Sequence, residues 1–270
     1  MKKLLAFAVV LCCAITCLAF VGCGSEEATV KIDDITIVDP PSNEIVAGTK
    51  FTLDCVILPE EVAEKVSVDW EISDTKRLTY SNGQFTAQAF GTVKVKATVK
   101  GNEIYDEIVL TVLPPVGYSE YTSTGYQLAY PQYWTHSNLG GGIHQWAASN
   151  GTTSMNIVTE EYNSAYMSAS ASDFQSSFKA MYEYLGYTVN FKQPVKLEKD
   201  NHLGFTRIQV TSIYSLTYGT NTSNIHQAQM IFNNSEANMS CVLTVTFAEE
   251  DFDSAAEKIQ QQIFSQFIPA

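Results

Sequence analysis

The chain has 270 residues, of which 45% are hydrophobic and 17% are charged, and this composition excludes an intrinsically disordered protein. Its formal net charge of −13 leaves few cations to neutralise phosphate groups, so we expect no nucleic-acid partner. The same acidic excess disfavours attachment to anionic lipid through charge alone.

Residues 1–22 have the three-part layout of a secretory signal peptide. Lys2 and Lys3 form a positive start, an apolar run covers residues 4–21, and Gly22 supplies a small residue at the expected cleavage point. The apolar run is also about long enough for a transmembrane helix, which is the alternative. Because the polar segment 24–27 follows directly, we favour cleavage.

The end of this signal resembles a known modification motif. The run Ala19-Phe20-Val21-Gly22-Cys23 is similar to a bacterial lipobox, although Phe20 stands where leucine is usual. The resemblance implies that diacylglycerol alkylates the thiol of Cys23 before cleavage, and that acyl chains such as palmitate anchor the mature lipoprotein. Two acyl chains hold a protein stably on a bilayer where one does not. We therefore expect an extracytoplasmic protein, lipid-anchored to the outer face of the cell membrane.

The cysteines of the chain agree with this interpretation. Of six cysteines, three lie in the signal and Cys23 is the expected anchor, which leaves Cys55 and Cys241. These two fall in different predicted domains, so we expect no disulfide between them. Each lies in an apolar strand pattern, where a thiol behaves as a small hydrophobic group.

Residues 23–30 form a polar tether, and residues 31–113 contain only strand signals. Short runs alternate apolar and polar side chains, as in 66–72, and turn residues such as Asn82-Gly83 separate them. Several short strands with this spacing predict a β-sandwich.

The turn residues of this segment carry a second resemblance. The pairs Gly48-Thr49 and Leu58-Pro59, the central Trp70, the run 82–87 and Gly91-Thr92-Val93 together resemble a bacterial immunoglobulin-like domain of group 2. This resemblance implies a small sandwich with Trp70 in its core. Such domains act as spacers or adhesive modules on exported proteins.

A linker over residues 114–123, which opens with Pro114-Pro115, leads to a second unit over residues 124–270. The pattern predicts a hairpin over 143–158, then a helix with Ser172 as N-cap and Gly186 at its end. Further expected elements are strands over 188–197, 203–217, 224–233 and 238–248, with turns that include Lys199-Asp200-Asn201, and a final helix over 252–267.

This order of elements, with the run Tyr130-Pro131-Gln132-Tyr133-Trp134 near its start, resembles the PsbP-like family. The resemblance implies an α/β/α sandwich and, for most members, no enzymatic activity. The expected fold class is therefore multidomain: an all-β immunoglobulin-like sandwich followed by an α+β domain with an antiparallel sheet.

No set of residues with catalytic spacing stands out. The four histidines form no H-E-x-x-H or similar ligand pair, although they could converge in space, and the run 140–142 lacks the lysine of a phosphate loop. Glu160 and Glu161 are adjacent on a strand and therefore point to opposite faces, which does not suit a glycosidase pair. The acidic run 249–253 lacks the spacing of a calcium loop and is better explained as helix capping. We expect no metal site, no cofactor and no enzyme.

Aromatic side chains are the most suggestive feature of the second unit, because tyrosine and tryptophan combine apolar area with a polar tip. Our candidate ligand groove consists of Tyr130, Tyr133, Trp134 and Tyr162. The favoured function is a non-enzymatic surface lipoprotein that binds an unidentified protein or small ligand and uses the first domain as a spacer. The alternatives are an enzyme or enzyme accessory that acts on cell-wall or imported material, and a host-binding adhesin. The sequence does not define the oligomeric state.

Overall fold

The computed structural model describes residues 31–38, 40, 42–202 and 205–269. The predicted signal peptide, the tether and Cys23 lie outside these residues, so their processing and lipidation stay predictions. The division into domains at residues 113 and 124 also stays a prediction, as do the immunoglobulin-like and PsbP-like resemblances.

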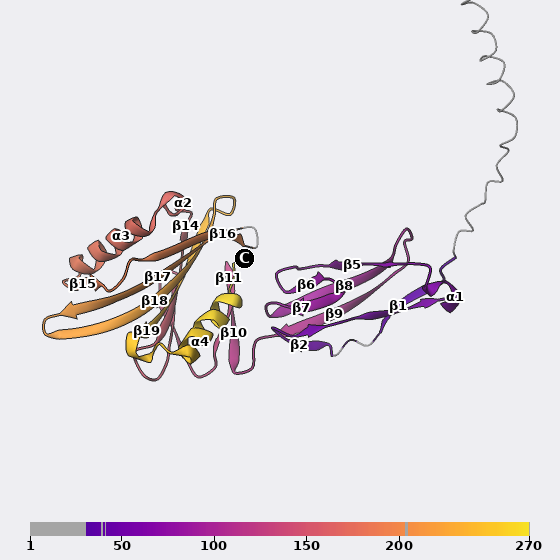
Figure 1. Ribbon diagram of the computed structural model, residues 1–270, viewed down its shortest axis with the longest axis horizontal. Coiled ribbons are helices and arrows are strands. Elements are labelled where there is room, and N and C mark those ends of the chain that lie inside the picture. Colours follow the sequence, from indigo (N-terminus) through magenta and orange to yellow (C-terminus); the bar gives the residue numbers. More distant parts are fainter. Residues whose placement is uncertain (1–30, 39, 41, 203–204, 270) are drawn as a thin grey trace, which may run out of the picture.

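The strands up to residue 113 form three small sheets (Figure 1). Strands β1 and β4 pair with each other, and α1 follows β4: β1 Asp34–Val38, β4 Asp54–Leu58, α1 Glu60–Ala63. A four-stranded sheet has the order β2 Glu44–Val46, β9 Tyr105–Leu113, β8 Gly91–Val99, β5 Val68–Ile72. A three-stranded sheet has the order β3 Lys50–Phe51, β7 Gln84–Ala87, β6 Leu78–Ser81.

One hydrophobic core joins these three sheets. The alternation in β8 buries Val93, Val95, Ala97 and Val99 on one face, as expected for a strand with one side on a core. Phe85 of β7 is fully buried, and Trp70 meets it edge-to-face with ring centroids 5.2 Å apart. Trp70 is itself only partly buried and packs at the margin of this core.

The rest of the described chain forms one three-stranded and one eight-stranded sheet. The smaller sheet has the order β10 Tyr118–Ser123, β11 Tyr126–Pro131, β20 Ile268–Pro269. The larger sheet is antiparallel and has the order β12 Thr135–Gly140, β13 Ile143–Ala147, β14 Ser154–Glu161, β19 Met239–Ala248, β18 Asn221–Asn234, β17 Phe205–Tyr218, β15 Thr188–Phe191, while β16 Lys196–His202 also pairs with β17.

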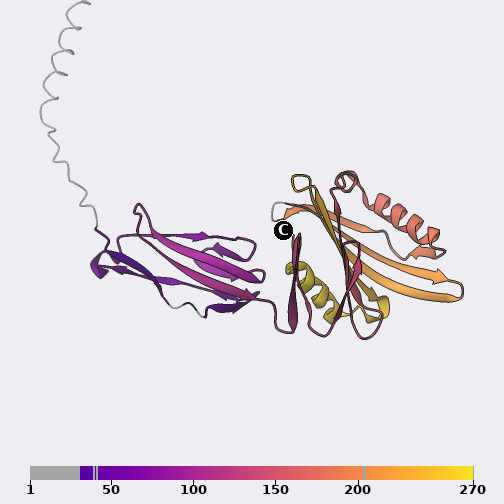
Figure 2. The same ribbon diagram turned by 180° about the vertical axis from the view of Figure 1, so that it is seen from behind.

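Helices cover the two faces of the large sheet unequally (Figures 1 and 2). Helices α2 (Ala165–Ser168) and α3 (Ala171–Tyr184) lie on one face. On the other face lie α4 (Ser254–Ser265), the short 3-10 turn η1 (Glu249–Asp251) and the small sheet. That second face is the apolar one: Cys241, Leu243 and Val245 of β19 are fully buried there against a cluster that includes Ile263 of α4.

The fold class expected from the sequence is wrong. The described residues are 54% strand and 16% helix, so the molecule is mostly β and not an all-β domain followed by an α+β domain. The physical reason is strand length. β17, β18 and α3 have 14 residues each, but a strand rises about twice as far per residue as a helix, so α3 covers only part of the length of these strands.

Several local predictions can be compared with the structure. Gly186 ends α3 with a positive φ of 86°, and the alternation predicted for β19 is confirmed. The N-cap of α3 is Ser170, with Asp173 as its capping-box partner, rather than Ser172. The predicted turn at Lys199-Asp200-Asn201 is wrong, because these residues pair with β17 inside β16. Six residues of the expected linker, Tyr118–Ser123, form β10.

A small set of polar contacts joins the sheets before residue 113 to those after it. Arg77 forms an ion pair with Asp74, donates to the backbone oxygen of Phe90, and donates to Gln127 Oε1 of β11 at 2.8 Å. Gln266 Nε2 donates to the backbone oxygen of Gln88 at 2.6 Å. Arg77 can lie against the backbone here because residue 91 is glycine: a Cβ at Gly91 would occupy the position of the guanidinium.

We predict that Ser170→Ala lowers the free energy of unfolding by about 1 kcal/mol, since it removes the hydroxyl that accepts from the backbone N–H of Asp173. Urea denaturation followed by circular dichroism measures this change. Ser176→Ala is the matched control, because Ser176 is exposed inside the helix and should change stability by no more than a few tenths of a kcal/mol. A larger loss in the control than in Ser170→Ala would contradict the observed cap.

Candidate functional site

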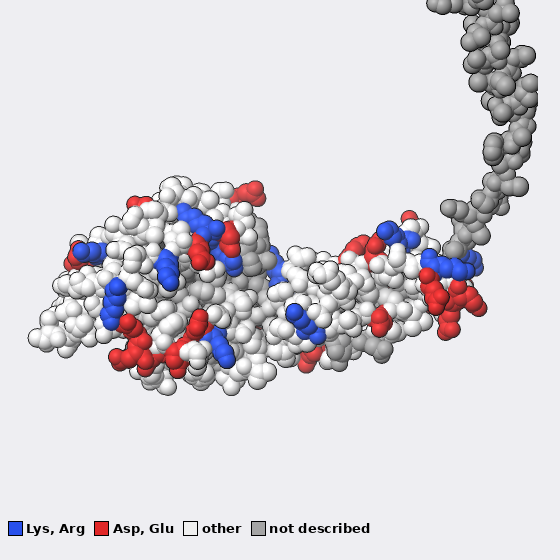
Figure 3. Space-filling view, in the orientation of Figure 1, with Lys and Arg blue, Asp and Glu red and all other residues white. Residues whose placement is uncertain are grey.

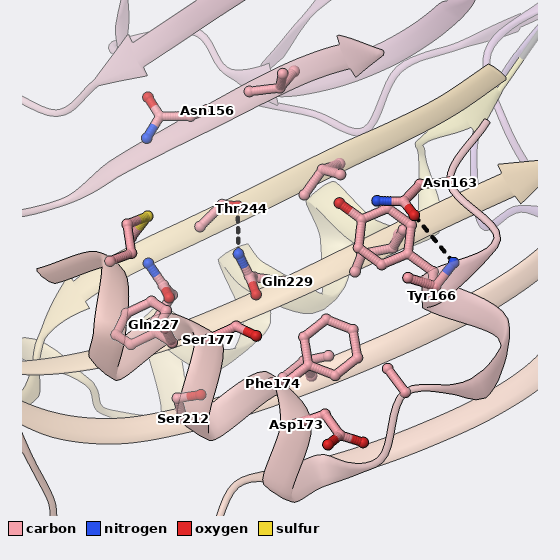
Figure 4. A pocket seen from close by; sticks show the side chains of 18 of the residues that line it. Asn156, Asn163, Tyr166, Asp173, Phe174, Ser177, Ser212, Gln227, Gln229 and Thr244 are labelled. Carbon is pink, nitrogen blue, oxygen red and sulfur yellow. Dashed lines mark hydrogen bonds between the residues drawn. The ribbon is translucent and has the colours of Figure 1, made fainter. Parts of the chain in front are cut away.

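A pocket of about 800 Å³ lies between α3 and the large sheet (Figure 4). Its lining comes from α2 and α3 on one side and from β14, β17, β18 and β19 on the other. This volume is within the range of pockets that hold small organic ligands. The pocket exists because α3 packs closely over only part of the sheet face.

The sheet floor of the pocket changes from apolar to polar along the strands. Directly opposed residues of an antiparallel pair share a face, so the register places Ser212 opposite Gln227 and Thr244 opposite both Gln229 and Asn156. Gln229 Nε2 donates to Thr244 Oγ1 at 3.2 Å (Figure 4). The apolar end of the same face is formed by Ile208, Val210, Ile231 and Val242, which pack with Phe174.

The helical side of the pocket is aromatic. Phe174, Phe178, Met181 and Tyr182 of α3 line it, together with Tyr166 of α2. The rings of Tyr166 and Phe174 are nearly parallel, with centroids 6.2 Å apart, and Tyr166 Oη donates to Glu160 Oε1 at 2.7 Å. Burial raises the pKa of the Tyr166 and Tyr182 phenols, so both are neutral and keep a hydrogen-bond donor at neutral pH.

The lining carries almost no charge. Asp173 is the one carboxylate in it, and it already accepts from the backbone N–H and the hydroxyl of Ser170 at 2.8 and 2.7 Å. These hydrogen bonds lower the pKa of Asp173, so it stays ionised as a helix cap. The pocket therefore offers amides, hydroxyls and rings, and this set suits an uncharged ligand.

One floor residue has an unpaired polar atom. Among the described residues, Asn156 Oδ1 is shielded from water and has no hydrogen-bond partner. Leaving a buried acceptor unpaired costs about 1–3 kcal/mol. Because Asn156 lines the pocket, rotation of its amide toward a ligand donor would remove that cost.

The four residues of the sequence-predicted groove do not line this pocket. Tyr133, which is 61% exposed, and Trp134, which is 4% exposed, both line a smaller hollow of about 280 Å³ with Asp251 and Asp253. Tyr130 packs against Trp146 with centroids 5.7 Å apart. Tyr162 is half-buried directly after β14. The structure thus brings Tyr133 and Trp134 together, and the groove as a ligand site stays a prediction.

Sequence reasoning singled out the aromatic side chains of the second unit as a group but missed the polar floor. The signal was present in the strands, where Gln227, Gln229 and Thr244 alternate with the buried residues of the opposite face. Polar residues at alternate positions usually indicate a face in water. Only the position of α3 shows that this face lines a pocket instead.

Two histidines that do not line this pocket lie next to each other. His136 Nε2 of β12 and His144 Nδ1 of β13 are 3.1 Å apart, and Tyr121 Oη of β10 lies 3.2 Å from the same Nδ1. His226 is buried and stacks on Phe252, and this burial lowers its pKa despite the opposing effect of two nearby glutamates.

The remaining acidic motifs have structural partners. Glu160 accepts from Tyr166, as described, and Glu249 forms an ion pair with Lys192. Asp251 accepts from the hydroxyl of Thr152 at 3.0 Å. In the described part of the chain, no three side chains of His, Cys, Asp or Glu gather closely enough to hold a metal ion. Both described cysteines, Cys55 and Cys241, are free thiols.

The charged surface shows how these side chains are distributed. Figure 3 shows acidic side chains gathered at the end of the molecule that carries α1, with basic side chains scattered among acidic ones elsewhere on that face. Within the ranges that the structure describes, none of the helices combines the length and apolar character that crossing a membrane requires.

Comparison with known proteins gives structural likenesses only. No family model matches the chain, and no curated protein matches it. A protein from Bacteroides thetaiotaomicron is 9% identical, with a TM-score of 0.38. The match covers 57% of this chain and 49% of that protein, so this chain spans about half of its length.

Two further solved structures are similar over about the same share of the chain. The Ran-binding protein Mog1p of Saccharomyces cerevisiae is 9% identical, with a TM-score of 0.38, over 56% of this chain and 94% of its own. A protein of unknown function from Pseudomonas aeruginosa is 16% identical, with a TM-score of 0.32, over 57% of this chain and 97% of its own. With TM-scores below 0.5, these likenesses support no conclusion about function.

We predict that Asn156→Leu raises the free energy of unfolding of the ligand-free protein by about 1 kcal/mol, because it removes an unpaired buried acceptor. Urea denaturation measures the change. Gln229→Leu is the matched control on the same floor; it breaks the hydrogen bond to Thr244 and should lower stability by about 1 kcal/mol. A loss of stability in Asn156→Leu would show that this amide has a partner in solution.

Proposed function

We propose that this chain is an extracytoplasmic lipoprotein, anchored through Cys23, that binds a small uncharged ligand in the pocket beneath α3 and does not transform it. The observation that supports binding most directly is the pocket itself, with an aromatic side on α3 and an amide and hydroxyl floor on the sheet. Residues 31–113 would hold the pocket-bearing sheet away from the bilayer.

The chemistry of the lining favours a saccharide or a similar neutral polyol. Sugar rings have C–H faces that pack on aromatic rings and hydroxyl rims that pair with amides. Phe174, Phe178 and Tyr182 supply the rings, and Gln227 and Asn156 supply amides on the opposite side. An ionic ligand would find no free opposite charge, because the single lining carboxylate, Asp173, caps its own helix.

A neutral ligand also fits the proposed location. Without Lys2 and Lys3 the proposed mature chain has 14 basic and 29 acidic side chains, and this excess repels anionic polymers, whereas neutral cell-wall or nutrient glycans would approach the protein freely. The groove of Tyr133 and Trp134 would be a second, smaller contact on the same molecule.

Binding can be tested by titrating the protein with neutral hexose oligomers and N-acetylglucosamine oligomers in calorimetry and amide NMR. We predict that Ser177→Trp fills the pocket from α3. It should weaken the binding of any glycan that the unchanged protein binds at least about tenfold, equivalent to about 1.4 kcal/mol. Ser176→Trp is the matched control, since its neighbour position on the same helix does not line the pocket.

Two results would contradict this site. One is the absence of binding or NMR shifts at pocket residues for every glycan tested. The other is equal weakening by both tryptophan variants, which would place the ligand elsewhere on the helix or the surface.

The anchor has its own test. We predict that mass spectrometry of the protein extracted from its native membrane shows loss of residues 1–22 and a diacylglycerol adduct on Cys23. Cys23→Ser should abolish both the adduct and the cleavage that removes residues 1–22. Cys17→Ser, within the apolar run, should leave both unchanged. An intact Met1 or an unmodified Cys23 in the membrane fraction would overturn the lipoprotein proposal.

A further inference from the structure

Three strands bring three potential metal ligands to one point at the edge of the large sheet. Tyr121 lies on β10, His136 on the edge strand β12 and His144 on β13. The ring centroids are 4.8 Å apart for Tyr121 and His136, 5.3 Å for the two histidines, and 5.4 Å for Tyr121 and His144. All three side chains are half-buried, so an ion could reach them from solvent.

The hydrogen bonds within this group cannot all be satisfied. His144 Nδ1 lies within 3.1 Å of His136 Nε2 and 3.2 Å of Tyr121 Oη. A ring nitrogen carries either one proton or one lone pair, so one atom cannot serve two partners fully. The planes of the two imidazoles differ by 15°, and their nitrogens face each other, so the favoured contact in the empty protein is one N–H···N hydrogen bond.

We propose that Tyr121, His136 and His144 form a binding site for a divalent transition-metal ion, with Cu(II) bound most tightly. On binding, the proton between His136 Nε2 and His144 Nδ1 would move to the other nitrogen of its ring, and the phenol proton of Tyr121 would pass to solvent. The ion then accepts lone pairs from two imidazole nitrogens and one phenolate oxygen. With metal–nitrogen distances of about 2.0–2.1 Å, two nitrogens 3.1 Å apart subtend an angle of about 100° at the ion. The imidazoles need to tilt toward the ion, and a water molecule completes the coordination.

The surroundings hold the ligands in place. Trp146 is fully buried and stacks on His136 with centroids 4.6 Å apart and planes 25° apart. It also meets Tyr121 edge-to-face at 5.1 Å. These contacts keep the three ligand side chains beside one another before an ion arrives, and the imidazoles tilt within this packing when it binds.

The ligand types select the ion. Two imidazoles and a phenol are nitrogen and oxygen donors of intermediate softness, which suit Cu(II), Ni(II) and Zn(II) rather than Mg²⁺ or Ca²⁺, and Cu(II) stands highest in the affinity order. No third His, Cys, Asp or Glu among the described residues joins the pair, so tyrosine is the third protein ligand. This site is separate from the pocket and does not depend on its ligand.

The test is titration of the full chain, purified without a polyhistidine tag, with Cu(II) in calorimetry, visible absorption and electron paramagnetic resonance. We expect one Cu(II) per chain with nitrogen hyperfine coupling. His136→Ala and His144→Ala should each weaken binding at least about tenfold. Tyr121→Phe should abolish the phenolate-to-copper absorption band and keep the nitrogen coupling.

Matched controls are His226→Asn, at a histidine that stacks on Phe252, and Tyr133→Phe, which remove the same kinds of group outside the site and should leave binding unchanged. His136→Gln serves as a second variant, since it keeps a polar group beside His144, and thermal melting without copper checks that each variant folds. Copper binding that survives loss of both His136 and His144, or a wild-type protein that binds no Cu(II), would overturn the proposal. Equal weakening by His226→Asn would do the same.

Discussion

Strand alternation in the large antiparallel sheet is the constraint on which the rest of the structure depends. Successive residues of β18 and β19 point to opposite faces, so each strand must satisfy two different environments at once. One face, with Leu243 and Val245, is apolar along its length and buries α4 and the small sheet. The other is apolar around Val210, Ile231 and Tyr214, which pack with aromatic side chains of α3, and polar along Gln229, Thr244 and Asn156. The pocket is the space left by that mismatch.

The alternation of apolar and polar residues predicted the strands and the buried face well, because this alternation depends only on local sequence. Cys241, Leu243 and Val245 could be placed on one face without knowing their neighbours, and Gly186 could be placed at a helix end. The features that were missed depend on tertiary structure. Whether Ser170 or Ser172 caps α3 depends on where the preceding turn ends, and residues 199–201 extend as a strand only because β17 pairs with them. The mostly-β class, too, follows from pairing that lengthens strands.

The two candidate sites were invisible in sequence for the same reason. Thr244 is 88 residues from Asn156 and 15 residues from Gln229 in the sequence, yet the strand register aligns all three in one row. His136 and His144 meet across a hairpin, and Tyr121 reaches them from another sheet. Each site also contains or adjoins a buried polar atom with no partner among the described residues, Asn156 Oδ1 in the pocket and Trp146 Nε1 beside the histidines. Local rules are broken most often where a protein binds something.

Gly91 has a consequence beyond its own turn. Its φ of 123° and the lack of a side chain let the guanidinium of Arg77 lie on the backbone and reach Gln127 on the far side of the junction. Any side chain at this position would displace that cation while leaving both hydrophobic cores intact. Substitution of this one small residue would therefore remove the Arg77–Gln127 hydrogen bond between the sheets before residue 113 and those after it, so the polar junction depends on a residue that contributes no side chain to it.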